Sequence, residues 1–145
     1  MITQFTVVAS DAPSLDDALE AWWDMSMEIT GGATDLLGKP HGWSGGSGDE
    51  EKAWAKAIMD AAQPVGSVVY MKAGDSFTIP VMATSTDEHI ALGFADSVGS
   101  KFHYRIEGAI GVRVPKGANE YIITGVYEVT SMSPDQADLK FLHRA

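Results

Sequence analysis

Two stretches in the first half of the chain carry apolar side chains at helical spacing. In residues 14–29 apolar positions recur every three or four residues, and Asp16 and Asp17 stand in the first turn, where the helix dipole favours acids. Residues 49–62 repeat this pattern, again with acids at the start. The spacing predicts two helices, preceded by a short β-branched strand at residues 4–9.

After residue 66 the pattern changes from helical to alternating. Short runs rich in Val, Ile, Tyr and Phe are separated by Gly, Pro and Asp, which is typical of strands joined by turns. We expect strands at residues 67–71, 76–79, 81–83, 101–106, 110–114, 121–123 and 126–130, with a short helix at residues 87–96. Helices first and strands afterwards predict an α+β fold rather than a parallel α/β fold.

The length and the change of pattern predict a single domain over residues 1–145. Its N-terminal part, residues 1–66, is expected to be mainly helical and to contain a glycine-rich loop at residues 30–48. That loop has neither a Gly-x-Gly-x-x-Gly after a strand nor a Gly-Lys-Ser/Thr, so it predicts no dinucleotide fingerprint and no P-loop. Residues 67–132 are expected to form the β core, and residues 133–145 a solvated tail.

Composition and charge exclude several kinds of chemistry. Without cysteine the chain can form no disulfide, zinc–thiolate site or iron–sulfur cluster. Its four histidines lack the short spacing of a metal site, so we expect no metal. The formal net charge is −10, with 11 acids against 3 bases in residues 1–71 and 9 against 7 in residues 72–145. This balance argues against a nucleic-acid partner, and leaves the acidic half either as a face for a basic protein or as an aid to solubility.

Targeting signals are not apparent in the sequence. No run of about 18 apolar residues is present, and the first residues lack the basic and apolar regions of a signal peptide. We therefore expect a cytoplasmic protein that does not enter a membrane.

A series of short motifs follows in order through residues 67–132. They are Val68-Val69-Tyr70, Gly74-Asp75-Ser76-Phe77-Thr78, Ala83-Thr84-Ser85-Thr86-Asp87, Ala91-Leu92-Gly93-Phe94-Ala95, Gly108-Ala109-Ile110-Gly111-Val112, Glu120-Tyr121-Ile122-Ile123 and Tyr127-Glu128-Val129-Thr130-Ser131. In this order they resemble the ADP-ribosyltransferases of the Arg–Ser–Glu class, above all the exoenzyme-like domains of bacterial toxins and phage-associated proteins. The resemblance implies a split, mostly antiparallel β core of ADP-ribosyltransferase type, with NAD as the substrate and no metal.

The resemblance also assigns roles to particular residues. In the family a first strand ends in an aromatic–Arg pair, a second ends in Ser-Thr-Ser before a short helix, and a later strand begins with the catalytic Glu. Carried over to this chain, Glu120 takes the catalytic position, and the NAD-binding positions fall on Tyr70, Thr84, Ser85 and Phe94. A fixed carboxylate suits the oxocarbenium-like centre that forms as nicotinamide leaves, and an Arg suits the NAD phosphates because its planar fork binds them at two points.

The chain departs from the family at two of the three signature residue types. Met71 stands in the Arg position, and Ala83 replaces the first Ser, which normally fixes the catalytic Glu. Ala118 stands two residues before Glu120, where Glu or Gln often selects the acceptor. At these positions the chain therefore has neither the cation that binds the NAD phosphates in the family nor the hydroxyl that positions the catalytic Glu.

Three basic residues of the β region are candidates for the missing cation. They are Lys72, Arg105 and Arg113. The alternative for the two arginines is a solvated strand face on which they pair with Glu107 or Glu128, and such exposed pairs contribute only about 0–1 kcal/mol.

Two functions remain open. One is an ADP-ribosyltransferase-like protein with impaired catalysis that acts as a binding or structural module for a protein partner, and as a virion or accessory component if it is phage-encoded. The other is an active mono-ADP-ribosyltransferase that transfers ADP-ribose from NAD to a protein through Glu120, with Ser85 or Thr84 in place of the lost Ser. Met71 and Ala83 favour the first.

Overall fold

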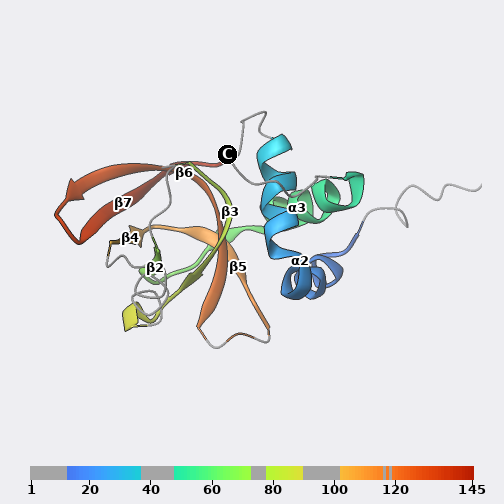
Figure 1. Ribbon diagram of the computed structural model, residues 1–145, viewed down its shortest axis with the longest axis horizontal. Helices are drawn as coiled ribbons and strands as arrows, with labels where there is room; N and C mark the ends of the chain where they lie inside the picture. Colours follow the sequence, from blue (N-terminus) through green and yellow to red (C-terminus); the bar gives the residue numbers. More distant parts are fainter. Residues whose placement is uncertain (1–12, 37–47, 73–77, 90–101, 116, 118) are drawn as a thin grey trace, which may run out of the picture.

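Two helices precede seven strands in the computed structural model, which describes residues 13–36, 48–72, 78–89, 102–115, 117 and 119–145 (Figure 1). The helices are α2 (Leu15–Leu36) and α3 (Asp49–Ala61). The strands are β1 (Gln63–Pro64), β2 (Val69–Lys72), β3 (Thr78–Ser85), β4 (His103–Glu107), β5 (Ile110–Arg113), β6 (Glu120–Met132) and β7 (Gln136–His143). The predicted α+β class is confirmed. Within the described residues, neither helix has the length and apolar character that crossing a membrane requires.

Helix α2 extends seven residues beyond the predicted end at residue 29 and includes two glycines. A Cβ atom on Gly32 would lie 2.8 Å from the backbone carbonyl of Glu51 in α3, so the missing side chain lets the two helix backbones approach closely. The glycine-rich loop predicted from residue 30 is therefore wrong for residues 30–36, while residues 37–47 lie outside the described part of the chain.

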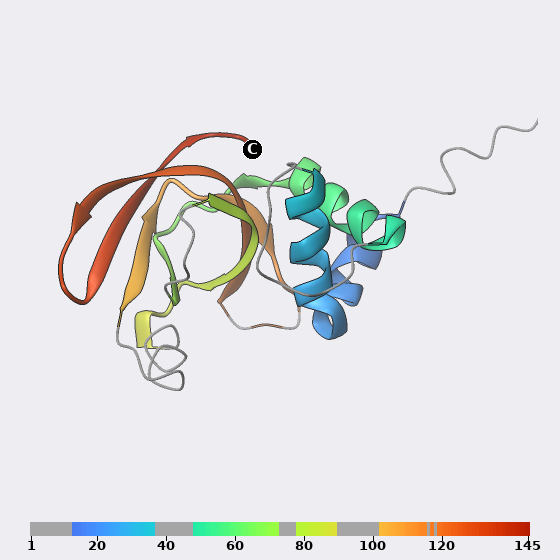
Figure 2. The same cartoon turned by 45° about the horizontal axis from the view of Figure 1, so that its top comes forward.

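All seven strands belong to one sheet, in the order β1-β5-β6-β3-β2-β4-β7. Strand β7, at one end of this order, also pairs with β6, so β6, β3, β2, β4 and β7 form a closed ring, and β5 and β1 extend from β6 outside it (Figure 2). Every pairing is antiparallel except that of β4 with β7. The described β core is thus mostly antiparallel, as expected, but it is connected rather than split, because the 13-residue β6 pairs with β3, β5 and β7.

Buried apolar side chains form one cluster inside the ring and another outside it. The inner cluster comprises Val69, Met71, Tyr104, Ile106, Ala109, Ile123, Tyr127, Ala137 and Leu139, and the partly buried Met82 of β3 packs against it. The outer cluster joins the helices to β3, β5 and β6 and comprises Ala18, Leu19, Trp22, Ile29, Ala33, Ala55, Ile58, Val81, Val112, Val114 and Ile122. The helices therefore cover the outer face of the ring where β3, β5 and β6 run (Figure 2).

Thr30 also joins α2 to the outer face of the sheet. Its buried hydroxyl lies 2.9 Å from the backbone carbonyl of Val81 in β3 and 2.9 Å from that of Ser26, one turn earlier in the helix. A polar side chain can be buried at this junction because the two carbonyls satisfy it.

Several strand boundaries differ from the prediction. The runs at residues 76–79 and 81–83 belong to one strand, β3, which continues through Pro80 because its register with β6 shifts between Ile79 and Met82. The two runs at residues 121–123 and 126–130 are likewise one strand, β6.

The prediction of a solvated C-terminal tail is wrong. Two other predicted elements lie wholly or partly outside the described residues. Residues 136–143 form β7, in which Ala137 and Leu139 are buried inside the ring while Asp138 between them points outward. The strand predicted at residues 4–9 lies outside the described residues, as does the helix predicted at residues 87–96 from residue 90 onward.

Candidate functional site

Four polar or aromatic residues lie side by side across the outer face of the ring. Ser85, at the end of β3, is directly opposite Tyr70 of β2 on one side and Glu120, at the start of β6, on the other. Arg105 of β4 is opposite Tyr70. Directly opposed residues on neighbouring strands point to the same face of a sheet. We call Glu120, Ser85, Tyr70 and Arg105 the Glu120 row.

Glu120 is positioned by the turn that leads into β6. Asn119 before it has a positive φ of 61°, a conformation that Asn tolerates better than most residues, and the Asn119 carbonyl accepts a hydrogen bond from the Thr86 N–H (2.9 Å). The Glu120 carbonyl accepts one from the Val114 N–H (3.0 Å). Its carboxylate lies against Gly117, where a side chain would collide with it.

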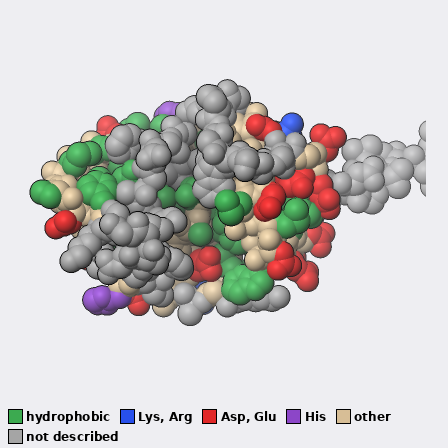
Figure 3. Space-filling view, viewed as in Figure 1, with side chains coloured by type: hydrophobic (Ala, Val, Ile, Leu, Met, Phe, Trp, Pro, Cys, Tyr) green, Lys and Arg blue, Asp and Glu red, His purple; other side chains and the backbone are tan. Residues whose placement is uncertain are grey.

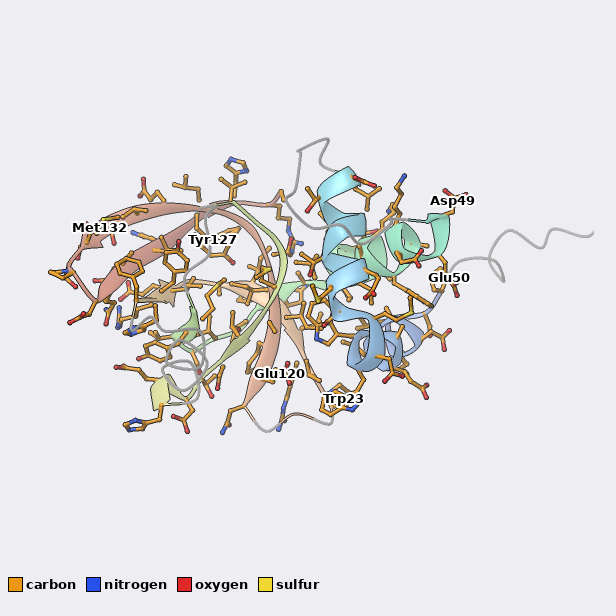
Figure 4. All side chains as sticks on the ribbon, in the orientation of Figure 1. Trp23, Asp49, Glu50, Glu120, Tyr127 and Met132 are labelled. Carbon is orange, nitrogen blue, oxygen red and sulfur yellow. The ribbon has the colours of Figure 1, made fainter. Side chains whose placement is uncertain are left out.

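The environment of the Glu120 carboxylate favours its neutral form. Partial burial raises the pKa of Glu120 above its ordinary value, because desolvation penalises the ionised carboxylate. The side chain stands at the end of the strands and keeps part of its surface exposed (Figure 4). It can therefore exchange protons with solvent and contact a small molecule.

The hydroxyls of Ser85 and Thr84 both have backbone partners. Ser85 is buried, and its Oγ accepts a hydrogen bond from the Asp87 N–H (3.0 Å) in the turn that follows β3. Thr84 is also buried, and its hydroxyl donates to the Tyr121 carbonyl (2.9 Å), which ties β3 to β6. Because neighbouring residues of a strand point to opposite faces, Thr84 faces away from the Glu120 row.

Met71 lies on the opposite face from the Glu120 row. Its side chain is only 6% exposed and packs inside the ring with Val69 and Tyr104. A guanidinium at this position would be buried among apolar side chains, which costs far more than a methionine there. Met71, which the resemblance aligns with an Arg, therefore belongs to the inner cluster and does not face Glu120.

Arg105 is the one predicted cation that belongs to the Glu120 row. It forms an ion pair with Glu107 (2.5 Å), as the solvated-face alternative predicted, and this hydrogen bond raises the pKa of Arg105. Along the sheet Arg105 and Glu120 are separated by three strand spacings, on the order of 14 Å. Arg113 is opposite Tyr121 and so points to the other face, while Lys72 lies opposite His103 in the register.

The remaining predicted positions are placed as follows. Ala83 is exposed on the outer face, two residues before Ser85 and opposite Ile122, so the position to which the resemblance assigns a Ser lies beside the Glu120 row. Phe94 and Ala118 lie outside the described residues.

His103 is a neighbour of the row that the sequence did not single out. It is buried, with its ring 6.3 Å from that of Tyr70 and its Nε2 4.0 Å from a carboxylate oxygen of Glu88. The signal for it was alternation, because His103, Arg105 and Glu107 occupy every second position of β4 and share one face.

In the part of the chain that the structure describes, no group of three or more His, Asp or Glu side chains could hold a metal ion. No family model, curated protein or solved structure matches the chain.

Proposed function

We propose that this chain is an ADP-ribosyltransferase-like scaffold that binds a protein partner and has little or no transferase activity. The observation that supports it most is the register that sets Tyr70, Ser85 and Glu120 side by side on three adjacent strands. The resemblance requires this order: an aromatic residue on a first strand, a Ser at the end of a second, and a Glu at the start of a later one.

Weak catalysis follows from what surrounds this row. Met71 faces the core and Ala83 has no hydroxyl, while the Ser85 Oγ, which accepts a hydrogen bond from the Asp87 N–H, lies two residues beyond the Ala83 position. Losing one preorganised donor costs about 10²–10³ in rate, and here both the phosphate-binding cation and the hydroxyl that fixes the glutamate have been replaced. Binding energy from the rest of the NAD molecule would have to compensate for both.

The second candidate function is an active mono-ADP-ribosyltransferase that uses NAD. It is favoured by the partly exposed Glu120 carboxylate, held at the start of β6 with Ser85 beside it. In this function Glu120 would stabilise the ribosyl cation, and Arg105 would have to exchange Glu107 for an NAD phosphate.

One experiment separates the two. The wild-type protein, Glu120→Gln and Glu128→Gln are titrated with NAD by calorimetry and assayed for nicotinamide release. Glu128 is an exposed acid on the same strand, outside the Glu120 row, so its variant controls for charge. We expect no nicotinamide release by any of the three proteins. Release that Glu120→Gln abolishes and Glu128→Gln keeps would establish the enzyme instead.

A further inference from the structure

We infer that helix α2 carries a docking surface, centred on Trp23, for a basic amphipathic segment of a partner protein. This inference deepens the binding role proposed above. It rests on the helices, and it does not depend on the Glu120 row or on the resemblance to ADP-ribosyltransferases.

The first observation is a large apolar side chain left in solvent. Trp22 is 4% exposed and belongs to the outer cluster, whereas the next residue, Trp23, is 53% exposed and projects from α2 (Figure 4). Met27, four residues on, is 57% exposed. The backbone of α2 leaves helical geometry between them, at Met25 (φ −130°, ψ 32°). Exposed Trp is uncommon on surfaces that remain solvent-exposed and is enriched in protein–protein interfaces.

The second observation is the charge around these side chains. The two helices carry ten Asp and Glu residues against two lysines. Lys52 lies 4.0 Å from Asp35 and Lys56 lies 2.5 Å from Asp60. Eight helical carboxylates are left without a basic partner among the described residues, and acidic side chains gather over the helices in Figure 3.

Two of these acids are near Trp23 on α2. Glu20 is one turn before it on the same side of the helix, and Asp24 is the next residue, about 100° further round the helix axis; both are exposed. We call Trp23, Glu20 and Asp24 the Trp23 patch. An apolar centre with a rim of one charge sign is the arrangement of an interface whose partner offers the opposite sign.

The charge decides among the possible occupants. Nucleic acids and anionic lipid surfaces bind through Lys and Arg and would be repelled by this rim. A second copy of the chain, docked through the same patch, would bring the same carboxylates against each other. A helix with Leu or Met on one side and Lys or Arg beside them satisfies both the apolar centre and the rim.

The test uses a fluorescein-labelled synthetic peptide of Leu and Lys at helical spacing, and a control peptide with Glu in place of every Lys. Binding to the full chain is followed by fluorescence anisotropy at low and high salt. We expect the Lys peptide to bind, the Glu peptide not to bind, and Trp23→Ala to weaken binding by at least about tenfold. Met132→Ala removes an apolar side chain of similar exposure from β6 and should leave the affinity unchanged.

A charge variant tests the rim separately. The double substitution Glu20→Gln and Asp24→Asn should weaken binding at low salt and reduce its salt dependence, because fewer ions are released on binding. Circular dichroism confirms that each variant is folded, which is expected because all the substituted side chains are exposed.

Three results would overturn the inference. They are equal binding of the Lys peptide to wild type and Trp23→Ala, binding of the Glu peptide as tight as that of the Lys peptide, and self-association of the wild type that Trp23→Ala abolishes. The last result would make a second copy the occupant. None of these results depends on NAD, so the docking surface and the proposed function can fail independently.

Discussion

The helices and the ring of strands are built on different principles. The helices have no core of their own, because their buried side chains pack in one cluster with Val81, Val112 and Ile122 of the sheet. The ring has an inner cluster that involves no helical residue and a hydrogen-bonded wall that closes on itself. The ring can therefore fix side chains such as Glu120 by backbone register, whereas the helices leave long charged side chains free to meet a partner.

The largest effects are expected when one buried side chain is removed from the helices or from the ring. Ile29 in α2 and Leu139 in β7 are both almost completely buried, and Ile→Ala or Leu→Ala at such sites costs about 2–5 kcal/mol. The chain's four tryptophans all lie in residues 1–66 and its four tyrosines all lie in residues 67–145, so tryptophan fluorescence follows the first part and second-derivative absorbance of tyrosine follows the second.

In urea we expect the tryptophan and tyrosine transitions of Ile29→Ala to coincide, and those of Leu139→Ala to coincide as well. The reason is that the outer cluster contains residues of both regions, which makes them one cooperative unit. If Ile29→Ala shifted the tryptophan transition alone, the helices would unfold as a domain separate from the ring.

A second prediction concerns the contact between the two helices. Gly32→Ala should destabilise the protein by about 1–3 kcal/mol, because its Cβ would meet the backbone of Glu51, which cannot move without shifting α3. Gly48→Ala is the comparison variant: its Cβ would meet only the end of the Glu51 side chain, which can rotate away, so only the smaller loss of a favoured N-cap residue is expected. Urea unfolding of both variants provides the measurement, and equal losses would mean that the close helix approach contributes nothing.

A third prediction concerns the inner wall of the ring. The buried Tyr127 hydroxyl donates to the Thr124 carbonyl (2.8 Å) and accepts from the Ile110 N–H (3.2 Å). Tyr127→Phe should cost about 1–2 kcal/mol because the Ile110 N–H loses its partner. Tyr121→Phe is the control, because no hydrogen bond of the Tyr121 hydroxyl is found within the described residues.

The same side chain makes stability depend on alkaline pH. Burial raises the pKa of Tyr127 to about 12, above the ordinary value of about 10 for tyrosine, so the folded state favours the neutral phenol. Its contribution should be complete below pH about 10 and be lost as the pH rises toward 12. Urea unfolding across this range should therefore show a steeper loss for the wild type than for Tyr127→Phe; parallel losses would contradict the assignment.

The smallest expected effect is at the end of the Glu120 row. Because burial raises the pKa of Glu120, the wild type gains stability from its protonated form in acid and loses that gain as the pH rises through the folded pKa. At neutral pH the free energy of unfolding of Glu120→Gln should equal that of the wild type or exceed it by less than about 0.5 kcal/mol. In acid, where the wild-type carboxyl is protonated, this difference should disappear. Thermal unfolding at several pH values would reveal it, and a large loss at neutral pH would show that the ionised carboxylate has a stabilising partner.

The sequence predicted the elements better than their connections. Helical spacing located both helices, and alternation located most strands, because burial on one face leaves a period in the chain. The glycines at 31 and 32 were misjudged because composition does not distinguish a loop glycine from one that admits a neighbouring backbone. The C-terminal strand was missed because Asp138 suggested solvent, although Ala137, Leu139 and Phe141 alternate with polar residues as a half-buried strand should.

The candidate site shows the same division. Sequence order named Tyr70, Ser85 and Glu120, and the pairing register brings them into one row. The sequence alone did not show that Thr84 and Met71 face the inside of the ring. Which face of the sheet a residue of a short buried strand takes is set by its pairing with neighbouring strands. The ion pair of Arg105 with Glu107 was among the predicted alternatives, because the two residues are spaced to share one face of a strand.

The closure of the ring also has a consequence for how the protein is made. Strand β7 fills the gap between β4 and β6, pairing parallel with one and antiparallel with the other. Until residue 143 has left the ribosome, the nascent chain exposes two open strand edges, which can capture strands of other molecules. Protection of these two strand edges therefore depends on β7, which is synthesised after the six other described strands of the sheet.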